Sequence, residues 1–343
     1  MHDEIIKKIL EYAGSDDVSG ETYPVFSGEG YKTFKIEPGN FHRIKKQVSG
    51  RKIAFIDGGN AQGIGSSNFS LSLMRVGCVC YLDGKKIAYK KNNFFALINS
   101  AAGSDEIFYE ASFYGVAPDF LEAEAFDSMD KTLMLGMNRA YINGGANAIR
   151  RFAELSVART ASETNGFCDA IVLDGNLLAS ITHEKKHMDG LQESCSKNNV
   201  ILAALSKTSS LFTDKAKPLS AALGGLCNMP SWFYNPVAEI SNPCHKAEIF
   251  FAKFHGKSRH VFRLDILNSQ KEHAEDIIGA LAGYCSDPIF PGYPYGLIEA
   301  DRVSRVSNEE RESLKAMFML KLRNRAIEDC ISSSDVHGIL DKI

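Results

Sequence analysis

Two short apolar segments of the sequence end in the same way, with an aspartate followed by a glycine. Residues 52–57 read KIAFID before Gly58, and residues 170–174 read AIVLD before Gly175. Short apolar runs that stop at glycine and asparagine are typical of buried β-strands. A carboxylate at the end of such a strand is costly to bury unless a partner compensates its charge. The pattern favours a fold in which two strand ends present aspartate at one sheet edge.

The remaining periodicity predicts strands that alternate with helices, and therefore an α/β fold. The sequence predicts strands at 68–82, 85–91, 199–208, 247–256 and 259–267. It predicts helical spacing at 1–14, at 118–163 with a break at Asn143–Gly145, at 271–285, and from Ser307 onward, where Ser307 and Glu310 form a capping box. We expect one domain over residues 1–343, with a mixed sheet flanked by helices. The helix at 1–14 and a C-terminal helix would be additions to a core at about 50–330.

The composition is that of a soluble globular protein. The chain has 343 residues, 44% of them hydrophobic, and its net charge of -3 excludes a strongly basic, histone-like protein. We expect no membrane-spanning segment, because the longest uncharged run contains prolines and glycines. Eight cysteines without a CxxC motif match no disulfide framework, so a reducing cytoplasm is the simplest compartment.

Asp57 and Asp174 are candidate ligands of a divalent metal ion. The carboxyl ends of strands in an α/β sheet are where ligands bind. Two carboxylates brought together there repel each other unless a cation lies between them, and Mg²⁺ or Mn²⁺ prefers oxygen ligands. The alternative is that each aspartate only caps a turn.

With these residues in view, the sequence resembles the NurA nucleases, which are similar to ribonuclease H-like proteins. The resemblance spans nearly the whole chain, and its pieces are FIDGGN at the first strand, RRFAELS on a helix, IVLDGNL at the next strand, ALSKTS, and PGYPYGLIEADR near the C-terminus. It implies a ribonuclease H-like core with a mixed sheet flanked by helices.

The resemblance also implies site residues. Asp57, Glu154 and Asp174 would be acidic metal ligands, and Tyr293 would line the site. Family members commonly carry a histidine eight positions after that tyrosine, where this chain has Asp301. Asp301 remains a competent oxygen ligand, so we expect it in the metal site, although a proton-transfer role at that position is in doubt.

The implied chemistry is hydrolysis of a phosphodiester with two Mn²⁺ or Mg²⁺ ions. Lys207 would hold a phosphate as a point charge, or be a surface lysine. The basic segment that contains Lys45, Lys46 and Arg51 would follow the DNA backbone, or be a solvated strand face; residues 85–91 are similarly basic. Tyr293 would orient water or stack on a base, or only pack.

By resemblance, the activity would be that of a 5′ to 3′ exonuclease and single-strand endonuclease that prefers Mn²⁺. The protein would be a cytoplasmic homodimer that docks on a HerA-type hexameric translocase. Together they would process single- and double-stranded DNA ends during repair of double-strand breaks.

Three other interpretations compete with this one. His183-Glu184-Lys185-Lys186-His187 has the HExxH spacing of zinc proteases, but the charged residues around it indicate a solvated helix or loop. Asp57-Gly58-Gly59 also resembles an ATPase phosphate loop, although residues 63–68 match neither a Walker nor a Rossmann pattern. Finally, the chain could be a catalytically silent DNA-end-binding subunit, which the aspartate at 301 favours and the three other acids disfavour.

Overall fold

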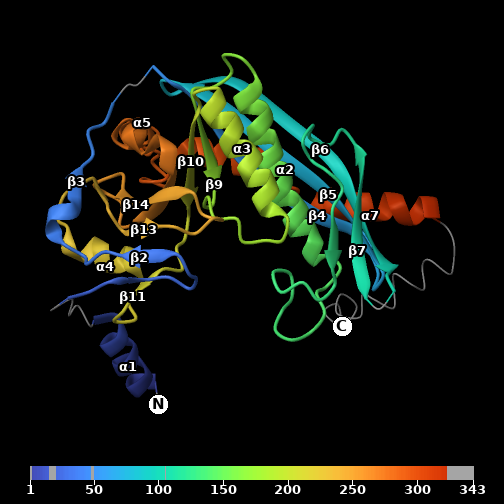
Figure 1. Cartoon of the computed structure of the whole chain (residues 1–343), viewed down its shortest axis with the longest axis horizontal. Coiled ribbons are helices and arrows are strands. Elements are labelled where there is room, and N and C mark those ends of the chain that lie inside the picture. The colour runs from blue at the N-terminus through green and yellow to red at the C-terminus, as the bar shows by residue number, and fades with distance from the viewer. Residues whose placement is uncertain (1, 15–20, 48–49, 105, 323–343) are drawn as a thin grey trace.

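One large mixed sheet forms the centre of the protein in the computed structural model, which describes residues 2–14, 21–47, 50–104 and 106–322 (Figure 1). Across this sheet the strands follow the order β3 (Phe41–Arg43), β12 (Trp232–Tyr234), β14 (Ala247–Lys253), β15 (Phe262–Leu267), β10 (Ile201–Ser206), β9 (Ala170–Asp174), β4 (Lys52–Gly65), β5 (Phe69–Leu82), β6 (Lys85–Ala102), β7 (Ile107–Gly115) and β8 (Ala125–Asp127). Two small sheets pair β1 (Pro24–Val25) with β11 (Phe212–Thr213), and β2 (Tyr31–Thr33) with β13 (Ala238–Ile240).

Helices cover both faces of the sheet. The helices of the described residues are α1 (His2–Gly14), η1 (Pro38–Asn40), α2 (Gly144–Glu163), α3 (Glu184–Lys197), α4 (Leu219–Leu226), η2 (Asn268–His273), α5 (Ala274–Gly283), α6 (Tyr295–Ser304) and α7 (Asn308–Leu322). Successive strand residues point to opposite faces: Ala54 and Ile56 pack with α2 and α3, whereas Ile53 and Phe55 pack with α5 and α6. The protein is therefore a three-layer α/β structure.

The centre of the sheet combines two kinds of strand pairing. β4, β5 and β6 form an antiparallel meander, and β9 and β10 continue the sheet from β4 as parallel strands. Helix α2 precedes β9, and α3 connects β9 to β10. The parallel pairing of β4 with β9 stops at Ile56 and Leu173, and β4 then continues to Gly65 in pairing with β5.

Several predicted elements are confirmed and two are wrong. The helix at the N-terminus, both hairpins and the helix after Ser307 are present. The first strand does not stop at Gly58, because β5 pairs with β4 as far as Gly65. Of the helical spacing expected over 118–163, the part after the break at Asn143–Gly145 is confirmed as α2, but the part before it is wrong, since residues 125–127 pair with β7. The part of the expected core beyond residue 322 lies outside the described residues.

The capping box is half formed. The backbone N–H of Glu310 donates to the Ser307 hydroxyl at 3.1 Å, as expected, but the Glu310 carboxylate binds Arg75 of β5 instead of the helix start. Arg75 also donates to the carbonyl of Arg305 at 2.7 Å. The turn between α6 and α7 is thereby held on the sheet.

None of the helices in the described ranges combines the length and apolarity that crossing a bilayer requires. The apolar side chains of α1 are exposed: Ile5, Ile6, Ile9 and Leu10 are each about half or more accessible.

Two glycines let α6 lie directly on β4. A Cβ at Gly59 would overlap the backbone carbonyl of Ser304, and a Cβ at Gly296 would overlap the ring of Phe55. Because neither position has room for a side chain, strand and helix pack at backbone distance. This packing brings Asp301 on α6 close to the end of β9.

We predict that Gly59→Ala lowers the free energy of unfolding by about 1–3 kcal/mol, because the added methyl group forces the strand and helix apart. Gly225→Ala is the matched control, since a Cβ there has nothing within 4 Å and alanine favours the helix. Denaturant titration measures both. Equal stability of Gly59→Ala and the native protein would contradict the close packing of α6.

Candidate active site

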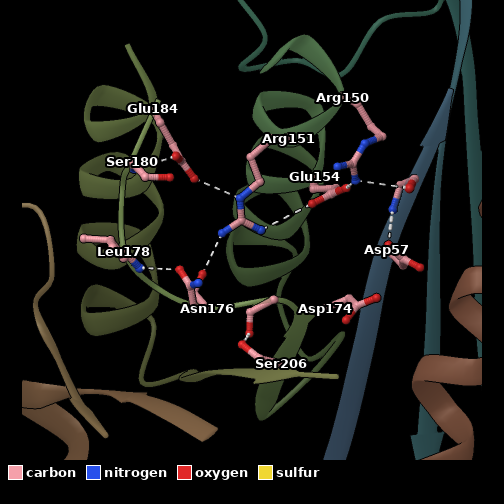
Figure 2. Close-up of polar contacts among 12 residues, drawn as sticks. Asp57, Arg150, Arg151, Glu154, Asp174, Asn176, Leu178, Ser180, Glu184 and Ser206 are labelled. Atoms are coloured by element: carbon pink, nitrogen blue, oxygen red, sulfur yellow. Dashed lines mark hydrogen bonds and ion pairs between the residues drawn. The ribbon is translucent and has the colours of Figure 1, made fainter. Parts of the chain in front are cut away.

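Asp57 and Asp174 lie together at the point where the parallel pairing of β4 with β9 stops. The paired residues of the two strands finish with Ile56 opposite Leu173, so the next residue on each strand is an aspartate. Asp57 is 6% exposed, and Figure 2 shows the Asp57 and Asp174 side chains on neighbouring strands in the same region. The matched sequence ending therefore corresponds to a shared position in space.

The acids are close enough to act on one another. Burial raises the pKa of Asp57 to about 7, and the negative charges of Glu154 and Asp174 add to this effect. Lys207 and the backbone N–H of Gly58 oppose the rise without cancelling it. A buried carboxylate with so little compensation gains stability from any additional cation.

Lys207 joins two of the acids. Its Nζ lies 2.6 Å from Oδ2 of Asp174 and 3.5 Å from Oδ1 of Asp301. Arg305 contacts the other oxygen of Asp301, Oδ2, at 2.9 Å. Burial alone would lower the pKa of Lys207, but the carboxylates around it outweigh burial and raise it. The lysine therefore stays charged as the counterion of Asp174 and Asp301.

Tyr293 lies against the same cluster. Its hydroxyl donates to Oδ1 of Asp174 at 3.4 Å, and its ring is 2% exposed, 5.9 Å from Nζ of Lys207. Burial, followed by the charges of Asp174 and Asp57, raises the pKa of Tyr293 far above its ordinary value. The phenol is therefore neutral and acts as a hydrogen-bond donor at the site.

Glu154 reaches the cluster from α2, and arginines bind it. It is 3% exposed, and a Cβ at Gly58 would lie 2.6 Å from its Oε1, so glycine leaves the room that it occupies. Its Oε1 binds Arg150, and its Oε2 lies 3.3 Å from Nη1 of Arg151 (Figure 2). Arg150 also donates to the carbonyl of Gly58 at 3.2 Å. Both carboxylate oxygens of Glu154 therefore face guanidinium groups.

Arg151 braces three elements around the site. Besides Glu154 it contacts Oε1 of Glu184 on α3 at 2.9 Å and donates to the carbonyl of Asn176 at 2.7 Å (Figure 2). The second oxygen of Glu184 accepts the backbone N–H groups of Ser180 and Ile181. The segment after Asp174 is thus tied to both α2 and α3.

The expectation that the HExxH segment is solvated is wrong for two of its residues. Glu184 is 2% exposed because it binds Arg151, and His187 is 8% exposed because its ring stacks on Phe152 at 4.6 Å. The Nε2 of His187 lies 3.3 Å from a carboxylate oxygen of Glu124. These residues join α3 to its neighbours.

A second buried acid supports the segment that follows Asp174. Asp265 on β15 is fully buried, contacts Arg263 at 2.7 Å and His245 at 3.0 Å, and accepts the backbone N–H of Leu177 at 3.1 Å. Burial would raise the pKa of Asp265, but the charge of Arg263 and the hydrogen bonds from His245 and Arg263 hold it well below its ordinary range.

The basic segment expected to contact DNA lies elsewhere. Lys45 and Lys46 are exposed. They lie next to α5, because the backbone N–H of the following residue, Gln47, donates to the carbonyl of Gly279 on that helix at 3.3 Å. Arg51 lies 3.6 Å from Asp276 and immediately precedes β4. The start of β4 is the opposite end of the strand pair from Asp57, so these cations are not brought to the acids.

The donor set fits a hard divalent cation in chemistry and charge. The oxygens of Asp57 and Asp174 are the ligand type that such cations prefer, and the raised pKa of Asp57 marks uncompensated negative charge. As the side chains stand, no group of three or more His, Cys, Asp or Glu in the described part of the chain is arranged to hold an ion. Lysine and arginine contact Asp174, Glu154 and Asp301 instead.

Sequence reasoning missed the two arginines. Arg150 and Arg151 precede Glu154 by four and three residues, a spacing that places side chains on one helix face. The RR pair before the glutamate was therefore the available signal. The further contacts of Arg151, to α3 and to the segment after β9, join distant parts of the chain and left no such signal.

The described fold is of the ribonuclease H-like class, with an antiparallel meander continued by parallel strands and an acidic cluster where β4 and β9 stop pairing. Its architecture is similar to the crystal structure of the NurA nuclease from Sulfolobus solfataricus, with a TM-score of 0.52 and 17% identity over 93% of this chain and 94% of that chain. This likeness confirms the expected fold class.

Two further solved structures are similar at a lower level. The catalytic domain of human Endonuclease V has a TM-score of 0.39 and 10% identity, covering 80% of this chain and 92% of that one. The Argonaute of A. aeolicus has a TM-score of 0.32 and 7% identity, covering 76% of this chain and 28% of that one. No family model matches the sequence, and no curated protein matches it.

We predict that acid removes the stabilising contribution of Asp265. Its folded pKa lies below the unfolded value of about 3.9, so the contribution is complete above that pH and is lost as the pH falls through the folded pKa. Asp265→Asn leaves Arg263 buried without its partner and should cost about 3–5 kcal/mol at pH 7.

Urea titrations at pH 7 and pH 3 check this prediction. The difference in stability between native protein and Asp265→Asn should be smaller at pH 3 than at pH 7. A difference that stays constant or grows on acidification would show that the folded pKa of Asp265 is not below its unfolded value, and would contradict the prediction.

Proposed function

We propose that this protein is a divalent-metal-dependent nuclease that hydrolyses DNA. The observation that carries the proposal is the position of Asp57 and Asp174, whose carboxylates lie together where the pairing of β4 with β9 stops, with the charge of Asp57 incompletely compensated. Lys207, Tyr293 and Asp301 lie around the same point. The fold shared with a NurA nuclease supports this interpretation.

Asp57 and Asp174 would hold two divalent ions, either Mn²⁺ or Mg²⁺. Asp301 and Glu154 would be further oxygen ligands. When bound, such ions supply an activated water and stabilise the leaving oxygen of a phosphodiester. Lys207, which is charged and half exposed, would turn from Asp174 to a phosphate oxygen. Tyr293 remains a neutral donor and would orient a water or phosphate oxygen.

Arg150 would exchange partners on DNA binding. Its side chain is 29% exposed, whereas that of Arg151 is 11% exposed and has three fixed contacts. A DNA phosphate offers Arg150 an alternative bidentate partner. Movement of Arg150 to the phosphate would free one oxygen of Glu154 for the cation and keep Arg151 in place as the brace.

The finer features of the proposal rest on the resemblance described above. They are 5′ to 3′ exonuclease and single-strand endonuclease activity, a preference for Mn²⁺, a cytoplasmic homodimer, and docking on a HerA-type translocase that processes DNA ends for double-strand-break repair. Fold likeness to the NurA nuclease supports the nuclease assignment on which these features depend.

Cleavage assays with labelled DNA test the proposal directly. Blunt, overhung and single-stranded substrates, labelled at either end, are incubated with Mn²⁺, Mg²⁺ or Zn²⁺. Mn²⁺-dependent shortening from the 5′ end supports the full proposal, and shortening from the 3′ end corrects only its polarity. Tight binding to DNA ends with no cleavage under any metal would favour the silent subunit, an alternative consistent with the arginine contacts of Glu154.

We predict that Asp57→Asn abolishes cleavage and keeps most of the DNA affinity. The same change should leave the metal-free protein at least as stable as the native one, because it removes a buried charge that Glu154 and Asp174 repel.

Thermal unfolding with Mn²⁺ provides a readout apart from activity. Ligand at 100 times its Kd stabilises a protein by about 2.7 kcal/mol, and Asp57→Asn should lose most of that gain. Glu163→Gln, at the exposed end of α2, is the control and should retain it. Normal cleavage by Asp57→Asn would remove this residue from the mechanism.

A further inference from the structure

An exposed apolar loop lies beside the acidic cluster, between α5 and α6. Ile289 is 93% exposed and Phe290 39% exposed. The loop is nevertheless ordered by its own contacts, because Oδ1 of Asp287 accepts the N–H groups of Ile289 at 2.8 Å and Phe290 at 3.1 Å. Two large apolar side chains are thus held in solvent by a fixed backbone, which core packing does not explain.

Phe290 belongs to a row of rings that leads to the acids. The row begins with His260, whose ring stacks on Phe290 at 5.3 Å with an interplanar angle of 29°. Phe290 lies edge to face with Tyr293 at 5.9 Å, and the hydroxyl of Tyr293 contacts Asp174. Only the outer members of this row, His260 and Phe290, are exposed.

The β14–β15 turn supplies positive charge next to the loop. Lys257, Arg259 and His260 are exposed on this turn, and neither Lys257 nor Arg259 has an ion-pair partner among the described residues. The turn and the loop touch, since a Cβ at Gly292 would lie 2.6 Å from Ser258. Flat rings and unpaired cations therefore share one surface at the edge of the site.

We propose that this surface, made by Lys257, Arg259, His260, Ile289 and Phe290, is a stacking site for single-stranded DNA. Phe290 stacks on a base that flanks the scissile phosphate, and Ile289 covers the outer side of that base. Lys257 and Arg259 contact the phosphates on either side. The inference rests on the proposed nuclease function, because it takes the acidic cluster as the place of cleavage.

Physical chemistry favours this occupant over an apolar protein surface. Base–aromatic stacking tolerates any sequence and operates together with cations that follow the backbone. A protein partner for Ile289 and Phe290 would have to bury or pair the neighbouring charges of Lys257 and Arg259. Nucleic acid complements both features at once, since it presents flat bases and phosphates at short intervals.

Fluorescence of 2-aminopurine tests the stacking directly. Single-stranded oligonucleotides that carry 2-aminopurine at successive positions are titrated with the uncleaving Asp57→Asn protein, alone or with a second change. One position should be quenched on binding. Phe290→Ala should remove that quench and weaken binding about 5- to 100-fold, the range for loss of one stacked base, whereas Phe290→Trp should restore both.

Two further variants separate stacking from charge and from general exposure. Lys257→Ala with Arg259→Ala should lower the salt dependence of binding by about 1.4 in slope, for two lost phosphate contacts on a single strand, and keep the quench. Tyr141→Ala removes an aromatic side chain that is 73% exposed and lies before α2. It should change neither the quench nor the affinity.

The outcomes distinguish this inference from the proposed function. If the native protein cleaves DNA while Phe290→Ala keeps the quench and affinity, the stacking site is wrong and the nuclease stands. If no metal supports cleavage while the Phe290-dependent quench persists, the stacking site stands and the nuclease is wrong. Unchanged DNA binding together with loss of a protein complex in Phe290→Ala would also overturn the inference.

Discussion

The parallel pairing of β4 with β9 decides where the acidic side chains lie. Because the pair ends at Ile56 and Leu173, the aspartate that follows on each strand is brought to one edge, and the two negative charges must share a small space. Cationic side chains around the site offset part of this repulsion. Lys207 lies between Asp174 and Asp301, and two arginines bind Glu154. The fold thus brings carboxylates together that repel each other. The surrounding lysine and arginines lower this repulsion, and a bound metal ion would lower it further.

The sequence could predict whatever depends on neighbouring residues. The strand end at Asp174, the Asp-Gly hairpin and the helix start at Ser307 all follow from local patterns, and the structure has them. The family resemblance supplied the fold class, which the comparison with a solved nuclease confirms.

Contacts between distant segments were beyond local reasoning. Glycines after Asp57 indicated a strand end, yet pairing with β5 supplies the hydrogen bonds that carry β4 to Gly65. The charge of Lys45 and Lys46 suggested contact with DNA near the acids. These lysines precede the start of β4, however, and that end of the strand is away from Asp57. Asp265 gave no sequence signal, since its partners His245 and Leu177 come together only in the folded sheet.

The position of α6 has a consequence for the protein during its synthesis. Asp57 and Asp174 leave the ribosome long before Tyr295–Ser304, the helix that covers β4 at Gly59 and Gly296 and brings Asp301 to Lys207. Until that helix emerges, the face of β4 that it covers is open and Lys207 lacks its contact with Asp301. A nascent chain therefore passes most of translation without a finished site, and truncated products that end before α6 cannot complete it.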